Sequence, residues 1–226
     1  MSVVVGFDTA TPVTTAAVLR PDGSAVEAHD APPAESRGRH AGRLLELIER
    51  VLREGGLAWE EVSRLAVGVG PGGFTGLRIG IATARALAQA RGLEVVPVSS
   101  LEALAAGVAS SQPVAAVIDA RRGEVFAAVF APDRSPLLAP AALTPEALAE
   151  LLAALPATPL AVGDGAVRFA EELASAGAVV PPAETPVHTL DAAHVCRLGG
   201  VREPVDRDAL LPTYLREPDA TPSVIT

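Results

Sequence analysis

Apolar runs and polar breaks along the first half of the chain alternate between the spacing of strands and the spacing of helices. Short runs rich in β-branched residues predict buried strands, and longer stretches with helical spacing predict helices. The predicted elements, in chain order, are strands at Val3–Phe7, Thr14–Leu19 and Ala25–Ala28, a helix at Arg39–Arg53, a strand at Leu65–Val69, a helix at Leu77–Gln89, a strand at Glu94–Val98 and a helix at Leu101–Ala109.

The second half of the chain repeats this order. Its predicted elements are strands at Val114–Asp119, Val125–Phe130 and Leu137–Ala141, a helix ending near Leu155, a strand at Leu160–Val162 and a helix at Val167–Ala176. Thr144 and Pro145 mark the start of the first of these helices, as an N-cap and a proline at the first helical position. Two such copies predict an α/β chain with a tandem ribonuclease-H-like, two-lobe fold, the architecture of the actin, sugar-kinase and Hsp70 (ASKHA) group.

The repeat also divides the chain, which at 226 residues is long enough for two lobes. We expect the first lobe at residues 1–106 and a smaller second lobe at residues 107–200. The C-terminal segment, residues 201–226, is expected to pack back on the first lobe.

Composition narrows the classes of function. The net charge of −9 argues against binding of nucleic acid by this chain unaided, because phosphate contacts need cationic side chains. The single cysteine, Cys196, excludes an internal disulfide and a multi-cysteine zinc site. We see neither a signal peptide nor an apolar run of membrane-spanning length, and we expect a cytoplasmic protein.

A glycine-rich segment, residues 68–80, joins a predicted strand to a predicted helix. It is not a Walker loop, since the chain contains no lysine, and it lacks the Gly-x-Gly-x-x-Gly dinucleotide pattern. Backbone N–H groups in such a loop can face an anion or a partner chain. Gly72 and Gly73 are therefore candidate phosphate-binding residues.

In the ASKHA architecture, nucleotide phosphates lie between the lobes and contact the first hairpin turn of each. The corresponding candidates here are Asp8, Thr9 and Thr11 in the first lobe, and Asp119 and Arg121 in the second. A carboxylate could hold a metal-bound water, and hydroxyl and guanidinium groups could bind phosphate. The same residue types also satisfy backbone groups in ordinary turns, so both interpretations stay open.

Four motifs together resemble the TsaB (YeaZ) family. They are VVGFDTAT at 4–11, GPGGFTGLRIG at 70–80, IDARRGEVF at 118–126 and PTYLR at 212–216, in the family's order and over essentially the whole chain. The resemblance implies a non-catalytic, dimerising subunit of the bacterial machinery that makes N6-threonylcarbamoyladenosine in tRNA. Its partners would be the TsaD-type paralogue, which carries the transferase site, and the TsaE-type ATPase. It also implies that tRNA is bound only through the complex, with ATP or ADP held weakly or not at all by the free subunit.

The resemblance further implies that this chain holds no metal and has no catalytic residue of its own. The TsaD-type paralogue binds its metal through a His-x-x-x-His pair on the first long helix, where this chain has His40 followed by Leu44. One imidazole does not anchor a transition metal.

Two helices are candidates for the partner interface. Leucine and isoleucine cover more than half of the circumference of the helix at 39–53, which exceeds the stripe that one sheet needs. The next helix has a ridge of small residues at steps of four. In the family, these helices pair with those of the TsaD-type paralogue or of a second copy; packing inside this chain is the alternative. The candidate interface residues are Leu44, Leu45, Ile48, Leu52, Gly76, Gly80 and Ala84.

Two rival functions remain. An ATP-dependent phosphotransferase of the sugar-kinase class would need a base carboxylate at the cleft and ATP turnover by the isolated chain. A glycoprotease is disfavoured because the histidine pair of the wider superfamily is incomplete.

Overall fold

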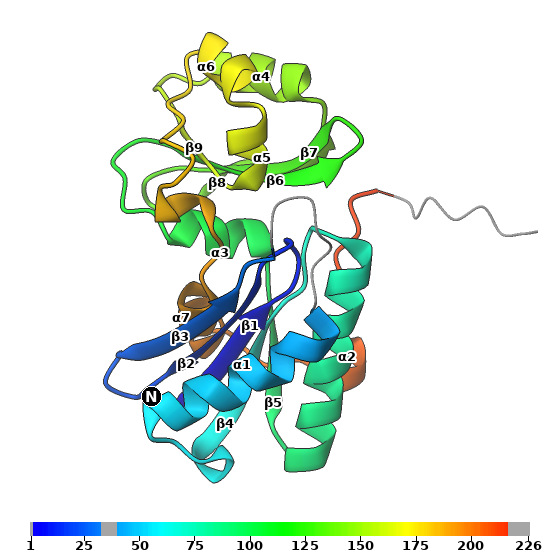
Figure 1. Cartoon of the computed structure of the whole chain (residues 1–226). Coiled ribbons are helices and arrows are strands. Elements are labelled where there is room, and N and C mark those ends of the chain that lie inside the picture. Colours follow the sequence, from blue (N-terminus) through cyan, green and yellow to red (C-terminus); the bar gives the residue numbers. More distant parts are fainter. Residues whose placement is uncertain (1, 33–39, 217–226) are drawn as a thin grey trace, which may run out of the picture.

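The computed structural model describes residues 2–32 and 40–216. It has two lobes, one above the other, and each contains one mixed β-sheet (Figure 1). The strand order is β3-β2-β1-β4-β5 in the first lobe and β8-β7-β6-β9 in the second. Each sheet combines three antiparallel strands with a parallel neighbour of the first strand. This repeat confirms the predicted α/β two-lobe fold.

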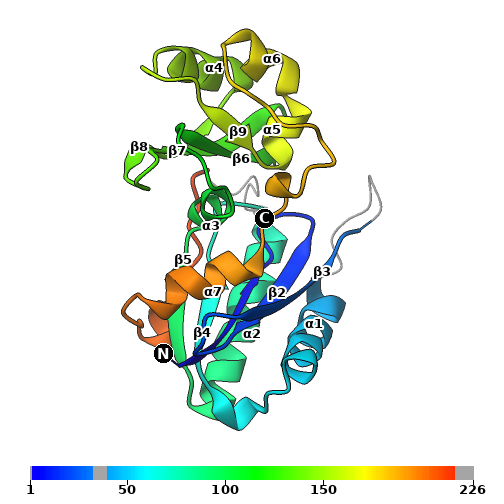
Figure 2. The ribbon, with the colours of Figure 1, turned by 90° about the vertical axis from the view of Figure 1, so that its left-hand side faces the viewer.

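In the first lobe, helices cover both faces of the sheet. Its elements are β1 (Val3–Asp8), β2 (Thr14–Leu19), β3 (Ala25–Asp30), α1 (His40–Gly55), β4 (Val62–Gly68), α2 (Phe74–Arg91) and β5 (Glu94–Val98). Helices α1 and α2 lie on one face, and α7 (Ala192–Gly200) lies on the other (Figure 2). All residues of β1 and β2 are buried because both faces of these strands are covered. Helix α2 starts at Phe74, before the predicted Leu77, whereas the predicted helix start at residue 39 lies outside the described residues.

The second lobe has the same hairpin sheet with shorter helices. Its elements are β6 (Val114–Arg121), β7 (Glu124–Phe130), β8 (Pro136–Leu143), α4 (Pro145–Ala153), β9 (Leu160–Val162), α5 (Asp164–Arg168) and α6 (Ala170–Ser175). Thr144 caps α4 as predicted, since its hydroxyl accepts the N–H of Ala147 at 3.2 Å. The helix predicted at 167–176 is instead split into α5 and α6, because the backbone leaves the helical conformation at Phe169.

The two lobes share one hydrophobic core. Helix α3 (Ser100–Ala106) lies between the sheets, as Figures 1 and 2 show, and its buried side chains Leu101 and Leu104 join a cluster that includes residues of both sheets and of α7. A second cluster fills the space between the first sheet and helices α1 and α2. Among the described residues, no helix is both long enough and apolar enough to cross a lipid bilayer.

The predicted lobe boundary at residue 200 assigns helix α7 to the second lobe, but this helix belongs to the first. It packs on β1, β2 and β4, where a Cβ atom at Gly6 would lie only 2.5 Å from the Cys196 sulfur. The physical reason is that the apolar face of α7 covers a face of the first sheet that α1 and α2 leave open. Residues 201–216 continue along the first lobe, where Val205 bridges to Val95 and Leu210 is buried, and residues 217–226 lie outside the described residues.

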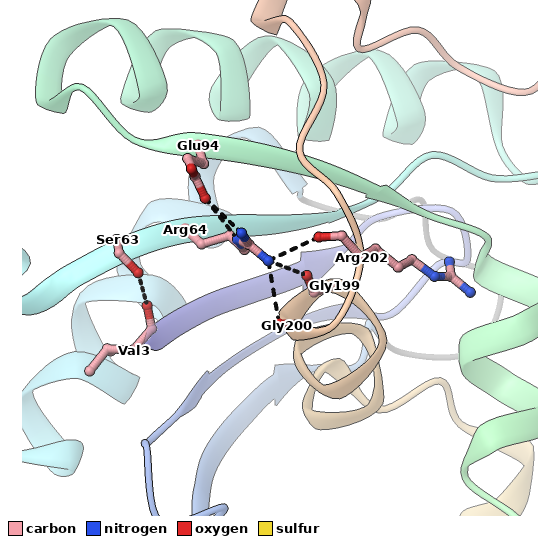
Figure 3. Close-up of polar contacts among 7 residues, drawn as sticks. All are labelled: Val3, Ser63, Arg64, Glu94, Gly199, Gly200 and Arg202. Atoms are coloured by element: carbon pink, nitrogen blue, oxygen red, sulfur yellow. Dashed lines mark hydrogen bonds and ion pairs between the residues drawn. The ribbon is translucent and has the colours of Figure 1, made fainter. Parts of the chain in front are cut away.

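Arg64 on β4 holds the C-terminal end of α7 in place (Figure 3). One guanidinium nitrogen donates to the carbonyl oxygens of Gly199, Gly200 and Arg202 at 3.0–3.3 Å. The other side of the guanidinium forms an ion pair with Glu94 on β5 at 2.7 Å. Because the last carbonyls of a helix have no partners inside it, Arg64 satisfies them and fixes α7 against the sheet.

Candidate functional site

The first candidate phosphate turn begins at Asp8, the last residue of β1. Asp8 is 1% exposed. Its Oδ1 accepts the N–H of Ala10 at 2.6 Å, and its Oδ2 accepts the hydroxyl of Ser100 at 2.5 Å. Ser100 in turn accepts the N–H of Gly70 at 3.2 Å, which connects the carboxylate to the glycine-rich loop. Burial raises the pKa of Asp8, although the hydrogen bonds from Ser100 and Ala10 act in the opposite direction.

The two threonines of this turn also have partners inside the chain. The hydroxyl of Thr9 donates to the carbonyl oxygen of Gly76 at 2.8 Å, and that of Thr11 lies 3.4 Å from the carbonyl oxygen of Val13. A Cβ atom at Gly80 would lie 2.5 Å from Thr9 Oγ1, and one at Gly76 would overlap the Thr9 carbonyl oxygen. The small residues of α2 therefore let this helix approach the turn closely.

The glycine-rich loop closes over the same turn. The N–H of Gly73 donates to the carbonyl oxygen of Ala10 at 2.7 Å. A Cβ atom at Gly72 would overlap the backbone of Ala10. The loop and the Asp8–Thr11 turn are thus packed on one another, and the Gly73 N–H has a partner within the chain.

The second candidate phosphate turn, Asp119–Gly123, joins β6 to β7 and is exposed at its tip. Asp119 Oδ2 forms ion pairs with Arg121 at 3.2 Å and with Arg168 of α5 at 2.7 Å. The side chains of these two arginines are 64% and 47% exposed. Asp164 accepts the N–H of Asp119 at 3.0 Å, and burial raises the pKa of Asp164. The second turn therefore presents guanidinium groups at the surface, unlike the first.

His40 is part of the packing between α1 and its neighbours. Its Nδ1 lies 2.8 Å from the hydroxyl of Thr14 on β2, and burial lowers the pKa of the imidazole. Leu44, one turn further along α1, is buried in the core. Within residues 2–32 and 40–216, no three His, Cys, Asp or Glu side chains gather in a group that could hold a metal ion.

Most of the residues predicted to face a partner are instead buried within this chain. Helix α1 packs on β2 and β3 and also on α2, so its wide apolar stripe serves two internal contacts. On α2, Gly80 faces Thr9, so a bulky side chain at Gly80 would disrupt the fold. Of the seven residues only Leu45 is exposed, at 50%. The six buried ones are Leu44, Ile48, Leu52, Gly76, Gly80 and Ala84.

Comparison with known proteins gives the family. The family model described as TsaD, tRNA N6-adenosine threonylcarbamoyltransferase, matches residues 30–176. The tRNA threonylcarbamoyladenosine biosynthesis protein TsaB of Escherichia coli is 35% identical over 170 residues, which are 72% of this chain and 71% of that protein. The solved structure of YeaZ from Pseudomonas aeruginosa matches with a TM-score of 0.79 and 32% identity over 95% of this chain and 100% of that one. The chain belongs to the TsaB (YeaZ) family.

Three further matches to this TsaB-family chain are partial or distant. The chain spans 34% of an uncharacterised Mycobacterium leprae protein at 40% identity. It spans 38% of the Haemophilus influenzae TsaB at 41% identity over 90 residues. The ROK hexokinase of Thermus thermophilus shares the fold alone, with a TM-score of 0.51 and 16% identity over 87% of this chain and 98% of that one.

Sequence reasoning missed one surface cluster of this TsaB-family chain. The rings of Phe74 and Tyr214 are stacked, with centroids 5.4 Å apart, and the Arg78 guanidinium lies 3.8 Å from the Phe74 centroid. Arg78 Nε also donates to the Tyr214 hydroxyl at 3.1 Å. Phe74 and Tyr214 each occur in a motif of the family resemblance, but no spacing rule relates positions so far apart in the chain.

Proposed function

We propose that this chain is a non-catalytic subunit of the machinery for N6-threonylcarbamoylation of adenosine in tRNA. It would bind a TsaD-type transferase, with the TsaE-type ATPase joining the assembly in the cytoplasm. The names of the E. coli and H. influenzae relatives and the TsaD family match support this role.

One observation carries the non-catalytic assignment. In ASKHA enzymes the carboxylate at the end of the first strand faces the nucleotide, whereas here Asp8 is enclosed by its own chain. The glycine-rich loop and the start of α2 occupy the other side of the same turn. Because Asp8 is only 1% exposed, the surrounding chain would have to move before its carboxylate could reach a metal-bound water. This geometry supports weak or no nucleotide binding by the free subunit.

The outer face of α1 is the best candidate for the partner contact. Leu45 is the most exposed of the predicted interface residues, and it lies in a shallow groove among charged side chains. The groove is lined by Arg43, Leu45, Glu46, Leu47, Glu49, Arg50 and Arg53. An apolar anchor ringed by charges of both signs suits a protein partner. The same face would serve a homodimer of the free chain.

The substitution Leu45→Asp tests this assignment. Burying Leu45 would contribute about 1 kcal/mol, and a carboxylate in its place would also have to lose water, so we expect at least a tenfold loss of affinity for the TsaD-type paralogue. Titration calorimetry with the purified paralogue measures this loss. Leu151→Asp is the matched control, because Leu151 is 43% exposed on α4 of the second lobe.

Unchanged affinity in Leu45→Asp would show that α1 is not part of the interface. If the wild-type chain did not bind the paralogue, the proposed function would be contradicted. The sugar-kinase alternative is tested separately, by titration with ATP and Mg²⁺ and by a hydrolysis assay. Saturable turnover of ATP by the isolated chain would favour that alternative.

A further inference from the structure

Arginine side chains and two aromatic rings form a continuous surface from the start of α2 to the second lobe. We call it the basic rim. On the first lobe it consists of the Arg78–Phe74–Tyr214 stack. Figure 1 shows the C-terminal segment (red) running from beside the start of α2 toward the end of the second lobe that holds the β6–β7 hairpin. The members of the rim are Phe74, Arg78, Arg121, Arg122, Arg168, Tyr214 and Arg216.

An ion pair connects the two halves of the rim. Arg216, two residues after Tyr214, forms an ion pair with Glu124 at 2.7 Å. Glu124 directly follows the turn that contains Arg121 and Arg122, both exposed. The rim therefore continues from the aromatic stack, through the ion pair, to the second turn and Arg168.

The sign of charge on the rim is opposite to that of the whole chain. Five arginines lie on it, and their partners include the carboxylates of Asp119 and Glu124. Asp164 is half-buried, and desolvation raises its pKa. The chain as a whole carries −9. A local excess of positive charge on an acidic protein is complementary to a polyanion.

The aromatic stack suits a base. The Arg78 guanidinium covers the Phe74 ring, and this ring is stacked on Tyr214. Tyr214 is therefore the last member of the stack, and it is 39% exposed. Single-stranded RNA is recognised through bases stacked on aromatic rings and through arginine contacts to phosphates.

We propose that the basic rim contacts an unpaired segment of RNA, with one base on Tyr214 and the phosphates along Arg121, Arg122 and Arg168. This inference rests on the proposed function, which supplies tRNA as the RNA. It assigns to this subunit a direct contact with the substrate of the complex. Because the chain is acidic overall, the contact adds to the affinity of the complex and gives weak binding by the chain alone.

The test uses a fluorescently labelled, unmodified tRNA transcript and measures its anisotropy during titration with the complex of this chain and the TsaD-type paralogue. One variant is R121N/R122N, because Asn accepts the positive φ of 65° and 57° at these positions. We expect it to lower the slope of log Kd against log[salt] by about 2. The other variant is Tyr214→Ala, which should weaken binding about fivefold or more.

Matched controls separate the rim from general effects. R91Q/R197Q removes two exposed arginines, one at the end of α2 and one on α7, that belong neither to the rim nor to the groove on α1. Tyr214→Phe keeps the ring while removing the hydroxyl. Neither variant should change Kd more than about twofold. Equal loss in the rim variants and in R91Q/R197Q, or unchanged Kd in the rim variants, would overturn the inference. So would loss of paralogue binding in the rim variants, which would make the rim a protein interface.

Calorimetry with the paralogue, without RNA, distinguishes failure of this inference from failure of the proposed function. If wild-type chain and paralogue bind each other but the rim variants do not alter RNA affinity, only the inference fails. If they do not bind each other, the proposed function fails. The titration is then repeated with the chain alone at low salt, where rim-dependent binding supports the inference and no binding overturns it.

Discussion

The first hairpin turns of the two lobes occupy equivalent places in a repeated topology, yet their carboxylates have different partners. Asp8 is buried and is bonded to neutral donors, the Ser100 hydroxyl and the Ala10 N–H. The Asp119 side chain is also mostly buried, at 7% exposure, and it accepts the N–H of Arg121, but it is paired with two exposed guanidinium groups, those of Arg121 and Arg168. The sheet alone therefore does not decide what such a turn does. The difference comes from what packs on it, which is the glycine-rich loop with α2 in one lobe and solvent-exposed arginines in the other.

This comparison separates two roles within one fold. The first turn works as a structural joint, which fixes α2 and the glycine-rich loop against β1. The second keeps charged side chains at the surface, where they can contact another molecule. In an ASKHA enzyme both turns would face the nucleotide, and here only the second has exposed cationic groups of the kind that bind phosphate.

The largest loss of stability should come from adding one methyl group where α2 packs on the first turn. In Gly76→Ala the new Cβ would overlap the carbonyl oxygen of Thr9, and backbone atoms cannot move aside cheaply. We expect the free energy of unfolding to fall by about 3 kcal/mol or more. Urea denaturation followed by circular dichroism measures this loss.

Gly123→Ala is the comparison in the second turn. A Cβ at Gly123 meets no atom within 4 Å, so its cost of about 1 kcal/mol comes only from the positive φ of 80°. Equal losses in the two variants would contradict the assignment of the first turn as a tightly packed joint.

The sequence predicted the architecture because strand order in this fold follows local patterns. Apolar runs and the turns at residues 8–11 and 119–123 are visible without tertiary information. The partner of Asp8 was not predictable in this way, because Ser100 is separated from it by most of the first lobe.

The predicted interface residues show a second limit of prediction from the sequence. A ridge of small residues indicates that some backbone approaches α2, but the pattern at Gly76 and Gly80 is the same whether that backbone is internal or from a partner. The structure assigns it to the Thr9 turn. Likewise, the wide stripe of α1 arises from two internal neighbours, the sheet and α2, and the sequence does not distinguish two internal contacts from one internal and one external. Order along the chain also placed α7 in the wrong lobe, since packing of the last helix on the first sheet is a long-range choice.

The next largest difference should appear when each carboxylate is removed. Asp8→Ala leaves the buried N–H of Ala10 and the Ser100 hydroxyl without their acceptor, which should cost about 2–4 kcal/mol. Asp119→Ala loses ion pairs to exposed arginines and the acceptor of the Arg121 N–H, which water can replace at this exposed turn, so it should cost about 1 kcal/mol. Thermal unfolding of both variants at pH 7 measures the difference. A larger loss in Asp119→Ala would reverse the comparison and place the structural joint in the second lobe.

The smallest effect concerns a carboxyl group whose neighbour is another carboxyl group. Glu27 on β3 is hydrogen-bonded to Asp191, the N-cap of α7, and this bond raises the pKa of Glu27 to about 7. Burial and the negative charge of Asp191 also raise this pKa, whereas the positive charge of Arg197 lowers it. The folded chain therefore holds this proton more tightly than the unfolded chain, where the pKa is near 4.5. The stabilisation is complete below about pH 4.5 and is lost as the pH rises through about 7. Because Glu27 is largely exposed, solvent screening reduces the effect to about 1 kcal/mol.

The substitution Glu27→Gln removes this titration but keeps a donor toward Asp191. Urea midpoints between pH 5 and pH 8 should therefore fall less steeply in the variant than in the wild type, and parallel profiles would show that the pair does not share a proton.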